Sequence, residues 1–225
     1  MSSRPQATVE LSLSLSTNTL SLSQSDQAVT ITVTATTLSS SNPSSGIVFN
    51  ARWTVMDDCE TTWLYPFRLR SVSDPPQFIR LRQQVFPSLV LPTEPDLRRN
   101  TLERFLVVPG VGQGSLTVEH TLTSSRIFQY SHLKPSAITP GAKYQFEVLV
   151  ARPSSSLPPR WWAFEDETVG KRFRKGVTEE IGSRYGDSIN AARRLMSEGW
   201  MYSHPTRDCK FVVKTDSPAV IQFTD

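Results

Sequence analysis

The residue types that most often perform chemistry in proteins are sparse in this chain. A cysteine thiol beside a histidine could act as a nucleophile with its base, but such pairs meet in space and spacing along the chain does not predict them. Zinc sites use cysteines or histidines two to four residues apart, and no such pair occurs here. We therefore expect neither a metal nor a catalytic cysteine among the two cysteines and three histidines, which are Cys59, Cys209, His120, His132 and His204.

An acidic cluster and a glycine-rich turn are two further candidates for ligand binding. The carboxylates of Asp57, Asp58 and Glu60 could hold calcium, yet they lack the spaced, glycine-containing loop of calcium sites. The turn at residues 109–114 is rich in glycine, but no lysine–serine pair follows it and no helix is expected to start there, unlike in a phosphate-binding loop. We interpret the first as an exposed acidic turn and the second as a connection between strands, and we expect no cofactor.

The most unusual local composition is a group of aromatic residues beside cations in residues 160–175. Such a group could stack on bases and meet phosphates, or it could insert into a peptide or lipid surface. It is equally typical of a strand in which one tryptophan fills the core while the cations form a solvated face. If Trp161 and Trp162 alternate across a strand, one ring is buried and the other is available for contact. Because tryptophan and arginine dominate contact energies, the candidate partner-binding residues are Arg160, Trp161, Trp162, Phe164, Arg172 and Arg174.

Charge and hydropathy favour an ordinary soluble surface. The formal net charge is +3, from 24 basic and 21 acidic residues, which is too balanced to predict a nucleic-acid partner. No apolar stretch follows the first residues, and no run reaches the roughly 18–20 apolar residues that a membrane span needs. We therefore expect a cytoplasmic protein without a membrane span, in which both cysteines stay reduced.

Residues 133–150, in which prolines and a glycine lead into the clearest strand, organise the rest of the chain. Pro140 and Gly141 are typical of the two central positions of a type II turn. Tyr144 and Phe146 then alternate with polar residues, which predicts a half-buried strand. By analogy with turn-pinned tyrosines of β-sandwiches, we expect the Tyr144 phenol to bond backbone upstream while its ring fills the core.

Alternation of apolar and polar residues predicts three strands in the first quarter of the chain. Residues 9–15 and 29–35 are two strands whose serines and threonines face water. Residues 38–46 have no apolar period and are interpreted as a loop. Residues 47–55 alternate again and predict a third long strand. Three early strands at this spacing indicate an antiparallel sandwich.

The middle of the chain is less regular because prolines interrupt it repeatedly. Residues 67–70 are interpreted as a short strand, followed by loops and edge segments. Residues 105–108 and 116–122 alternate on either side of the glycine-rich turn, which predicts a hairpin. His120 lies on the inward face of the second of these strands, so we expect a hydrogen-bonded core histidine.

The succession of these segments resembles uncharacterised fungal proteins that are predicted to form an all-β, immunoglobulin-like sandwich. The resemblance covers most of the chain in outline, and its matching features are strands, turns and a tryptophan pair. It therefore implies a fold and no catalytic residue. The segments that carry it are residues 105–110, 116–120, 133–135, 140–144 and 161–164, together with the opening strands and residues 217–223.

Residues 165–208 depart from this pattern and look like an insertion that contains the best helix of the sequence. Asp187 or Ser188 can cap the first turn, and Gly199 can end the helix. Its apolar face is short, consisting of Ile189, Ala192, Leu195 and Met196. Such a helix either lies on an edge of the sandwich or docks a partner.

These observations together predict one domain over residues 1–225, an antiparallel, immunoglobulin-like, all-β sandwich with a partly helical insertion at 165–208. We expect a non-catalytic protein-interaction module whose partner is another protein. The alternative is an enzyme with a small-molecule pocket between the sandwich and the insertion. A pocket with convergent polar groups would favour the enzyme, and a flat exposed aromatic patch would favour the module.

Overall fold

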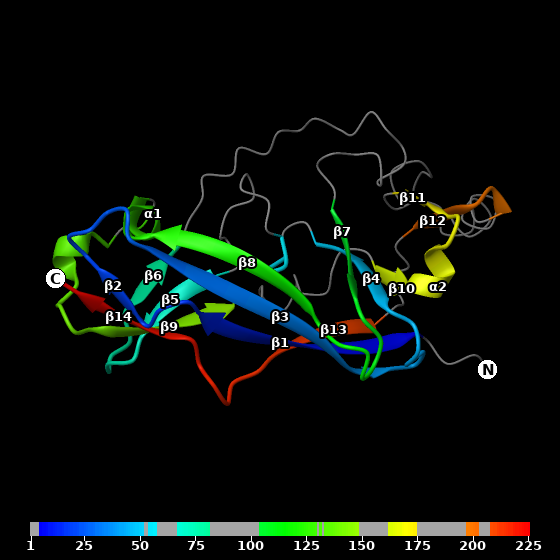
Figure 1. Cartoon of the computed structure of the whole chain (residues 1–225), viewed down its shortest axis with the longest axis horizontal. Helices are drawn as coiled ribbons and strands as arrows, with labels where there is room; N and C mark the ends of the chain where they lie inside the picture. The colour runs from blue at the N-terminus through cyan, green and yellow to red at the C-terminus, as the bar shows by residue number, and fades with distance from the viewer. Residues whose placement is uncertain are drawn as a thin grey trace, which may run out of the picture.

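The structure is a computed structural model that describes residues 5–51, 54–57, 67–81, 104–129, 131, 133–148, 162–174, 197–202 and 208–225, with the backbone alone at 173, 174, 202 and 208. These residues form fourteen strands, two short α-helices and one 3-10 turn (Figure 1). The expectation of a predominantly β protein is thereby confirmed. No helix within the described ranges is long and apolar enough to cross a membrane.

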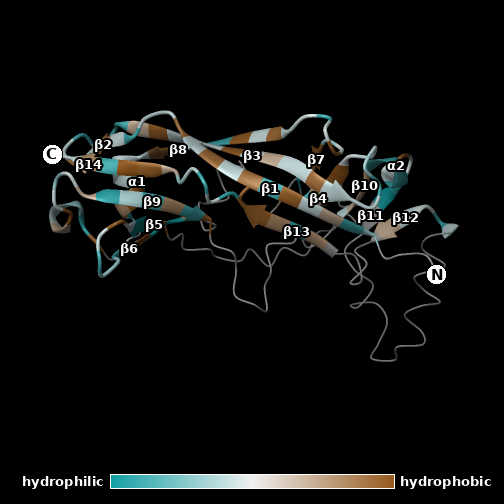
Figure 2. Cartoon of the chain, turned by 90° about the horizontal axis from the view of Figure 1, so that it is seen from below, coloured by the Kyte–Doolittle hydropathy of each residue, from teal (hydrophilic) through white to brown (hydrophobic). Residues whose placement is uncertain are grey.

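A long four-stranded sheet runs along the molecule and forms one layer (Figure 1). Its order is β13 (Asp208–Val213), β1 (Gln6–Leu15), β3 (Ala28–Ser40) and β8 (Leu116–Thr123). Alternate residues of β1 and β3 are buried, and the intervening positions are mostly serine and threonine. In Figure 2 this two-residue period appears as alternating brown and pale segments along both strands. The sheet therefore has one apolar face and one hydroxyl-rich face.

Two shorter sheets cover the apolar face of the long sheet. The five-stranded sheet has the order β2 (Thr19–Ser21), β14 (Val220–Thr224), β9 (Lys143–Val148), β5 (Phe67–Ser71) and β6 (Phe78–Arg80). The three-stranded sheet has the order β10 (Trp162–Phe164), β4 (Ile47–Asn50) and β7 (Phe105–Val108). Figure 1 places them at opposite ends of the long strands β1 and β3.

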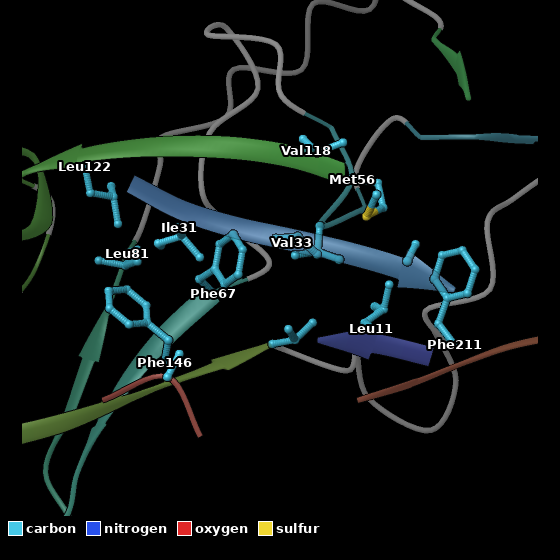
Figure 3. Packing of buried hydrophobic residues seen from close by; sticks show 14 of the residues in the cluster. Leu11, Ile31, Val33, Met56, Phe67, Leu81, Val118, Leu122, Phe146 and Phe211 are labelled. Carbon is cyan, nitrogen blue, oxygen red and sulfur yellow. The ribbon is translucent and has the colours of Figure 1, made fainter. Parts of the chain in front are cut away.

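One continuous core joins the three sheets. At one end, the ring of Phe67 on β5 meets the ring of His120 on β8 edge to face, with 5.3 Å between centroids. At the other end, Phe49 on β4 meets Phe211 on β13 in the same manner at 5.4 Å. Figure 3 shows Ile31 of the long sheet beside Phe67. The buried cluster includes residues of all three sheets, so the layers share one interior as in a β-sandwich.

The remaining elements are short. Helix α1 (Ser124–Gln129) follows β8, the 3-10 turn η1 (Pro135–Ala137) precedes β9, and helix α2 (Glu165–Thr168) follows β10. Strands β11 (Arg172–Arg174) and β12 (Trp200–Tyr202) form a small parallel sheet of their own. Most of the helix expected at residues 187–199 lies outside the described residues, although Gly199 has the positive φ of 81° expected of a helix-ending glycine.

The predicted strand around Tyr144 is confirmed in β9. Tyr144, Phe146 and Val148 are buried, and Gly141 in the preceding turn has a φ of 90°. The phenol O–H of Tyr144 donates to the side-chain carbonyl of Gln77 at 3.1 Å, so its described partner upstream is a side chain instead of the expected backbone. Burial raises the pKa of this phenol above its ordinary value.

The predicted hairpin of residues 105–108 and 116–122 is wrong. β7 pairs with β4, whereas β8 pairs with β3 in the opposite layer. The intervening loop crosses between the layers, and Thr37 fixes its start because its hydroxyl donates to the carbonyl of Pro109 at 2.7 Å. Both segments are strands, as their alternation predicted, but they pair with strands of different sheets.

Two strand boundaries and the direction of two strands also differ from expectation. β3 continues to Ser40, into the segment expected to be a loop. The third strand ends at Asn50 instead of reaching residue 55, because Thr54 begins a turn in which its hydroxyl donates to the carbonyl of Ala51 at 2.6 Å. The sheets are also mixed, since β13 runs parallel to β1 and β14 runs parallel to β2. The partners of these two parallel pairs are separated by most of the chain, so no tight hairpin restricts them to the antiparallel direction.

Candidate partner-binding surface

Trp162 and Phe164, two of the six predicted site residues, lie in the core. Their side chains are 4% and 5% exposed, and their rings meet edge to face with 5.4 Å between centroids. On the neighbouring strand β4, Trp162 is in register with Phe49 and Phe164 with Ile47. These two rings therefore hold β10 onto the interior and are not available to a partner in this structure.

The other four predicted residues are described to different extents. Arg172 lies on β11 and is exposed. Arg174 lies at the end of the same strand, in register with Tyr202, and only its backbone is described. Arg160 and Trp161 lie outside the described residues, so the expectation that Trp161 is the exposed ring stays a prediction.

The chain leaves β10 through helix α2, which is anchored to the loop after β3. The carboxylate of Asp166 accepts hydrogen bonds from the hydroxyl of Ser45 at 2.8 Å and from the amide of Asn42 at 3.0 Å. The backbone N–H of Glu165 donates to the carbonyl of Gly46 at 2.8 Å. The bond from Ser45, helped by that from Asn42, holds the pKa of the Asp166 carboxyl below its ordinary value. This network fixes the point from which β11 starts.

The guanidinium of Arg172 is held against Trp200, a residue that the sequence reasoning did not select. The guanidinium carbon lies 4.0 Å from the centroid of the indole ring, and Nη2 donates to the carbonyl of Glu198 at 2.8 Å. Arg172 and Trp200 are also direct partners in the parallel pair β11–β12. The indole is 8% exposed, so the cation covers its ring. We use the term Arg172–Trp200 face for Arg172, Trp200 and the carbonyl of Glu198.

The small β11–β12 sheet is supported from the side of the three-stranded sheet. Met201 packs against a cluster formed by Val48 and Ala163, which lie on the face of that sheet directed away from the main core. Phe105 of β7 borders the same cluster. The Arg172–Trp200 face is therefore attached to the sandwich both through α2 and through this apolar contact.

His120 is the buried core histidine that the sequence predicted. A carbonyl oxygen can only accept, so its contact of 2.7 Å with the carbonyl of Val55 means that Nε2 carries the proton and donates. Burial lowers the pKa of His120 below its ordinary value, and this effect outweighs the opposite influence of the Val55 hydrogen bond and of the nearby Asp57 carboxylate. The imidazole thus ties the turn at residues 54–57 to β8.

Acidification should destabilise the protein through His120. Below pH 6.5 the unfolded chain binds a proton at this imidazole while the folded chain resists it, so stability falls as the pH drops toward the lowered folded pKa. Each unit of pKa depression corresponds to about 1.4 kcal/mol. Urea unfolding between about pH 7.5 and about pH 5.5 measures this slope.

The matched variant for this measurement is His120→Gln, whose amide can still donate to the Val55 carbonyl but does not titrate. We expect the unfolding free energy of this variant to depend less steeply on pH, because glutamine does not titrate. Some dependence should remain, since the other histidines are present in both proteins. A variant that loses as much stability as the parent over the same pH range would contradict the assignment to His120.

The remaining chemical candidates give no further site in the described part of the chain. Within it, no three histidine, cysteine or acidic side chains lie close enough together to hold a metal ion. Cys209 is buried in β13. Cys59, Asp58 and Glu60 lie outside the described residues, as does most of the insertion beside which the alternative enzyme pocket was expected.

Comparisons with protein-family models, with curated proteins and with solved structures found no match to this chain. The resemblance to fungal sandwich proteins therefore stays a prediction. Any functional assignment has to be based on the geometry of the Arg172–Trp200 face.

Proposed function

We propose that the protein is a non-catalytic protein-interaction module that engages its partner through the Arg172–Trp200 face. The observation that supports this most is the exposed guanidinium of Arg172, stacked on an indole and bonded to the Glu198 carbonyl. Arginine and tryptophan are among the residue types that contribute most to protein–protein affinity. An arginine that is already ordered loses less side-chain freedom when a partner binds.

The chemistry of the guanidinium suits a polar group on a protein partner. One donor of Arg172 is used by the Glu198 carbonyl, and the planar group carries five N–H donors in total. The donors that project from the stack can bond a carboxylate or backbone carbonyls of a partner. The rigid attachment of the β11–β12 sheet through Met201 and through α2 supports this role, because binding residues act best on fixed elements.

We infer that this module is an immunoglobulin-like sandwich of the cytoplasm. The facing layers with one shared core support the first part, and in antibody variable domains the loops at one end of such a sandwich carry the binding residues. Two cysteines in 225 residues, without the spacing of a disulfide framework, support a reducing compartment.

Affinity capture with the full chain tests the proposal. Proteins captured from native cytosol by the parent are quantified against those captured by Arg172→Ala, Arg172→Lys and the control Lys214→Ala, which removes an exposed cation at the end of β13. We expect one or more partners to be lost by about 30-fold with Arg172→Ala, the effect of a residue worth about 2 kcal/mol.

Lysine keeps the charge but not the planar stack, so Arg172→Lys should also weaken capture. The Lys214→Ala control should leave it unchanged. Equal capture by the parent and both Arg172 variants would remove this face from the proposal, provided that the circular dichroism spectra and melting temperatures are the same.

A further inference from the structure

The outward face of the five-stranded sheet concentrates positive charge. The charged residues at its outward positions are Arg68 and Arg70 on β5, Arg80 on β6, and Lys143 and Glu147 on β9. Four cations and one carboxylate give this face the same formal charge of +3 as the whole chain carries. The hydroxyl-rich face of the long sheet differs, because its described charged side chains are Glu10, Glu119 and Lys210. The balanced composition therefore conceals a basic face.

Strand geometry explains why these cations gather. Phe67 and Leu69 on β5 point into the core, which leaves Arg68 and Arg70 on the opposite side. In the ladder, Arg68 stands between Arg80 of β6 and Glu147 of β9. The cations thus lie on three adjacent strands, and neighbouring strands of a sheet are only about 4.8 Å apart.

Glu147 shows which kind of group these arginines bind. Its Oε2 accepts from Nε of Arg68 at 2.6 Å, and its Oε1 lies 3.5 Å from Nη1 of Arg70. One carboxylate therefore bridges two guanidinium groups. Arg70 remains 49% exposed and Arg80 is exposed, so their outward sides are accessible. A second carboxylate arriving from solvent can extend the same pattern.

Two apolar side chains interrupt the charged surface. Val72 continues the line of Arg68 and Arg70 beyond β5, since its N–H donates to the carbonyl of Lys143 at 2.9 Å, and it is 62% exposed. Phe78 on β6 lies under the guanidinium of Arg68, 4.7 Å from carbon to ring centroid. We use the term basic face for Arg68, Arg70, Arg80 and Lys143 together with Val72, Phe78 and Glu147.

We propose that the basic face binds an acidic, extended segment of a partner polypeptide. Along an extended chain, every second side chain points the same way at intervals of about 6.8 Å, which is also the interval between Arg68 and Arg70 on β5. Alternate carboxylates of such a segment can meet successive cations, and an apolar side chain that follows them on the same face can rest on Val72. This inference does not depend on the Arg172–Trp200 face, which lies on a different sheet.

The same observations disfavour a nucleic acid or a lipid surface. Single-stranded nucleic acids need an open aromatic ring for base stacking, whereas the ring of Phe78 is already covered by Arg68. Four cations are also fewer than the roughly six to ten phosphate contacts by which strongly salt-dependent DNA-binding proteins hold their ligand. Membrane-surface elements also present large apolar side chains for insertion, and the exposed one here is a single valine.

Fluorescence anisotropy with the full chain and short labelled peptides tests this proposal. The probe is a twelve-residue peptide of alternating glutamate and serine, and its neutral match has glutamine in place of glutamate. We expect the parent protein to bind the acidic peptide more tightly than the neutral one, with an affinity that falls as salt is raised. The variant Arg70→Glu/Arg80→Glu should weaken binding by about 10-fold or more.

Three further variants make the result specific. Lys210→Glu/Lys214→Glu removes the same charge from another surface and should stay within about 2-fold of the parent. Arg172→Ala should not change peptide affinity, which separates this proposal from the proposed function. Arg70→Gln/Arg80→Gln avoids charge reversal, so it still reports on binding if the glutamate variant fails to fold.

Several outcomes would overturn the proposal. One is equal affinity of the parent for the acidic and the glutamine peptides at low salt. A second is equal weakening by the basic-face variant and by the Lys210→Glu/Lys214→Glu control. A third is tighter binding of a twelve-nucleotide thymidine strand or of phosphatidylserine vesicles than of the acidic peptide, which would assign the face to those ligands instead.

Discussion

Replacing Trp162 by alanine should lower the free energy of unfolding by about 3–5 kcal/mol, the usual cost of deleting a large buried aromatic ring. The indole is 4% exposed and lies against Phe164 on its own strand and beside Phe49 on β4. The substitution leaves a cavity in place of the indole, so the three-stranded sheet loses contacts with the core. Urea unfolding followed by circular dichroism measures the loss.

The matched control is Arg172→Ala, a short distance along the chain from Trp162. Its guanidinium is exposed, and its stack on Trp200 contributes little to global stability, so we expect a change of about 1 kcal/mol or less. If instead Trp162→Ala unfolds at the same urea concentration as the parent, the ring is not part of the core and becomes available as a binding residue.

The second large effect is expected at the opposite end of the sandwich. Phe146 on β9 is 2% exposed, within the same buried cluster as Trp162, and Phe146→Ala should cost about 3–5 kcal/mol. Because the three sheets share one core, this loss should be felt throughout the domain. Unfolding should be followed by two probes at once, namely circular dichroism of all strands and tryptophan fluorescence, to which Trp162 and Trp200 contribute from the far end.

Coincident transitions by both probes, shifted equally by Phe146→Ala, are the expected result for one cooperative unit. If the fluorescence transition stays in place while the circular dichroism transition moves, the two ends unfold independently. The prediction of one domain over residues 1–225 would then be wrong. Thr224→Ala, at an outward position of β14, serves as the control and should shift neither transition by much.

Alternation along the chain predicted several strands well, because a half-buried strand must place every second residue in the core. β1, β3, β8 and β9 were all recognisable in this way, as was the inward position of His120. The period says which face of a strand is buried, but it does not say which strand lies beside it. That is why β7 and β8 were expected to pair with each other, although they belong to opposite layers.

The candidate surfaces were harder to predict because they depend on contacts between distant residues. The stack of Arg172 on Trp200 joins positions separated by most of the insertion, and nothing in local spacing indicates it. One of Trp161 and Trp162 was expected in the core, and Trp162 is buried, but so is Phe164, which the composition had suggested as a binding residue. Residue type alone does not show whether an aromatic ring is buried in the core or exposed for contact with a partner.

The basic face, in contrast, has a readable pattern in the sequence. Arg68 and Arg70 alternate with Phe67 and Leu69, so both cations must lie on one side of a half-buried strand. The summed net charge does not show this pattern, because it carries no information on which face of a strand the charges occupy. Adding the charges separately for each face of each half-buried strand reveals the asymmetry from the amino-acid sequence alone.

The parallel pairing of the first strands with the last ones also affects how the protein is made. β1 has β13 as one neighbour, and β2 is completed by β14, where the hydroxyl of Ser21 reaches the carbonyl of Asp225 across 204 positions of sequence. During synthesis, β1 and β2 must therefore wait until β13 and β14 have been made, at roughly 5–20 residues per second. Until then the edge of β1 is an open template for unwanted pairing, so newly made chains should depend on chaperones more than the stability of the finished fold would suggest.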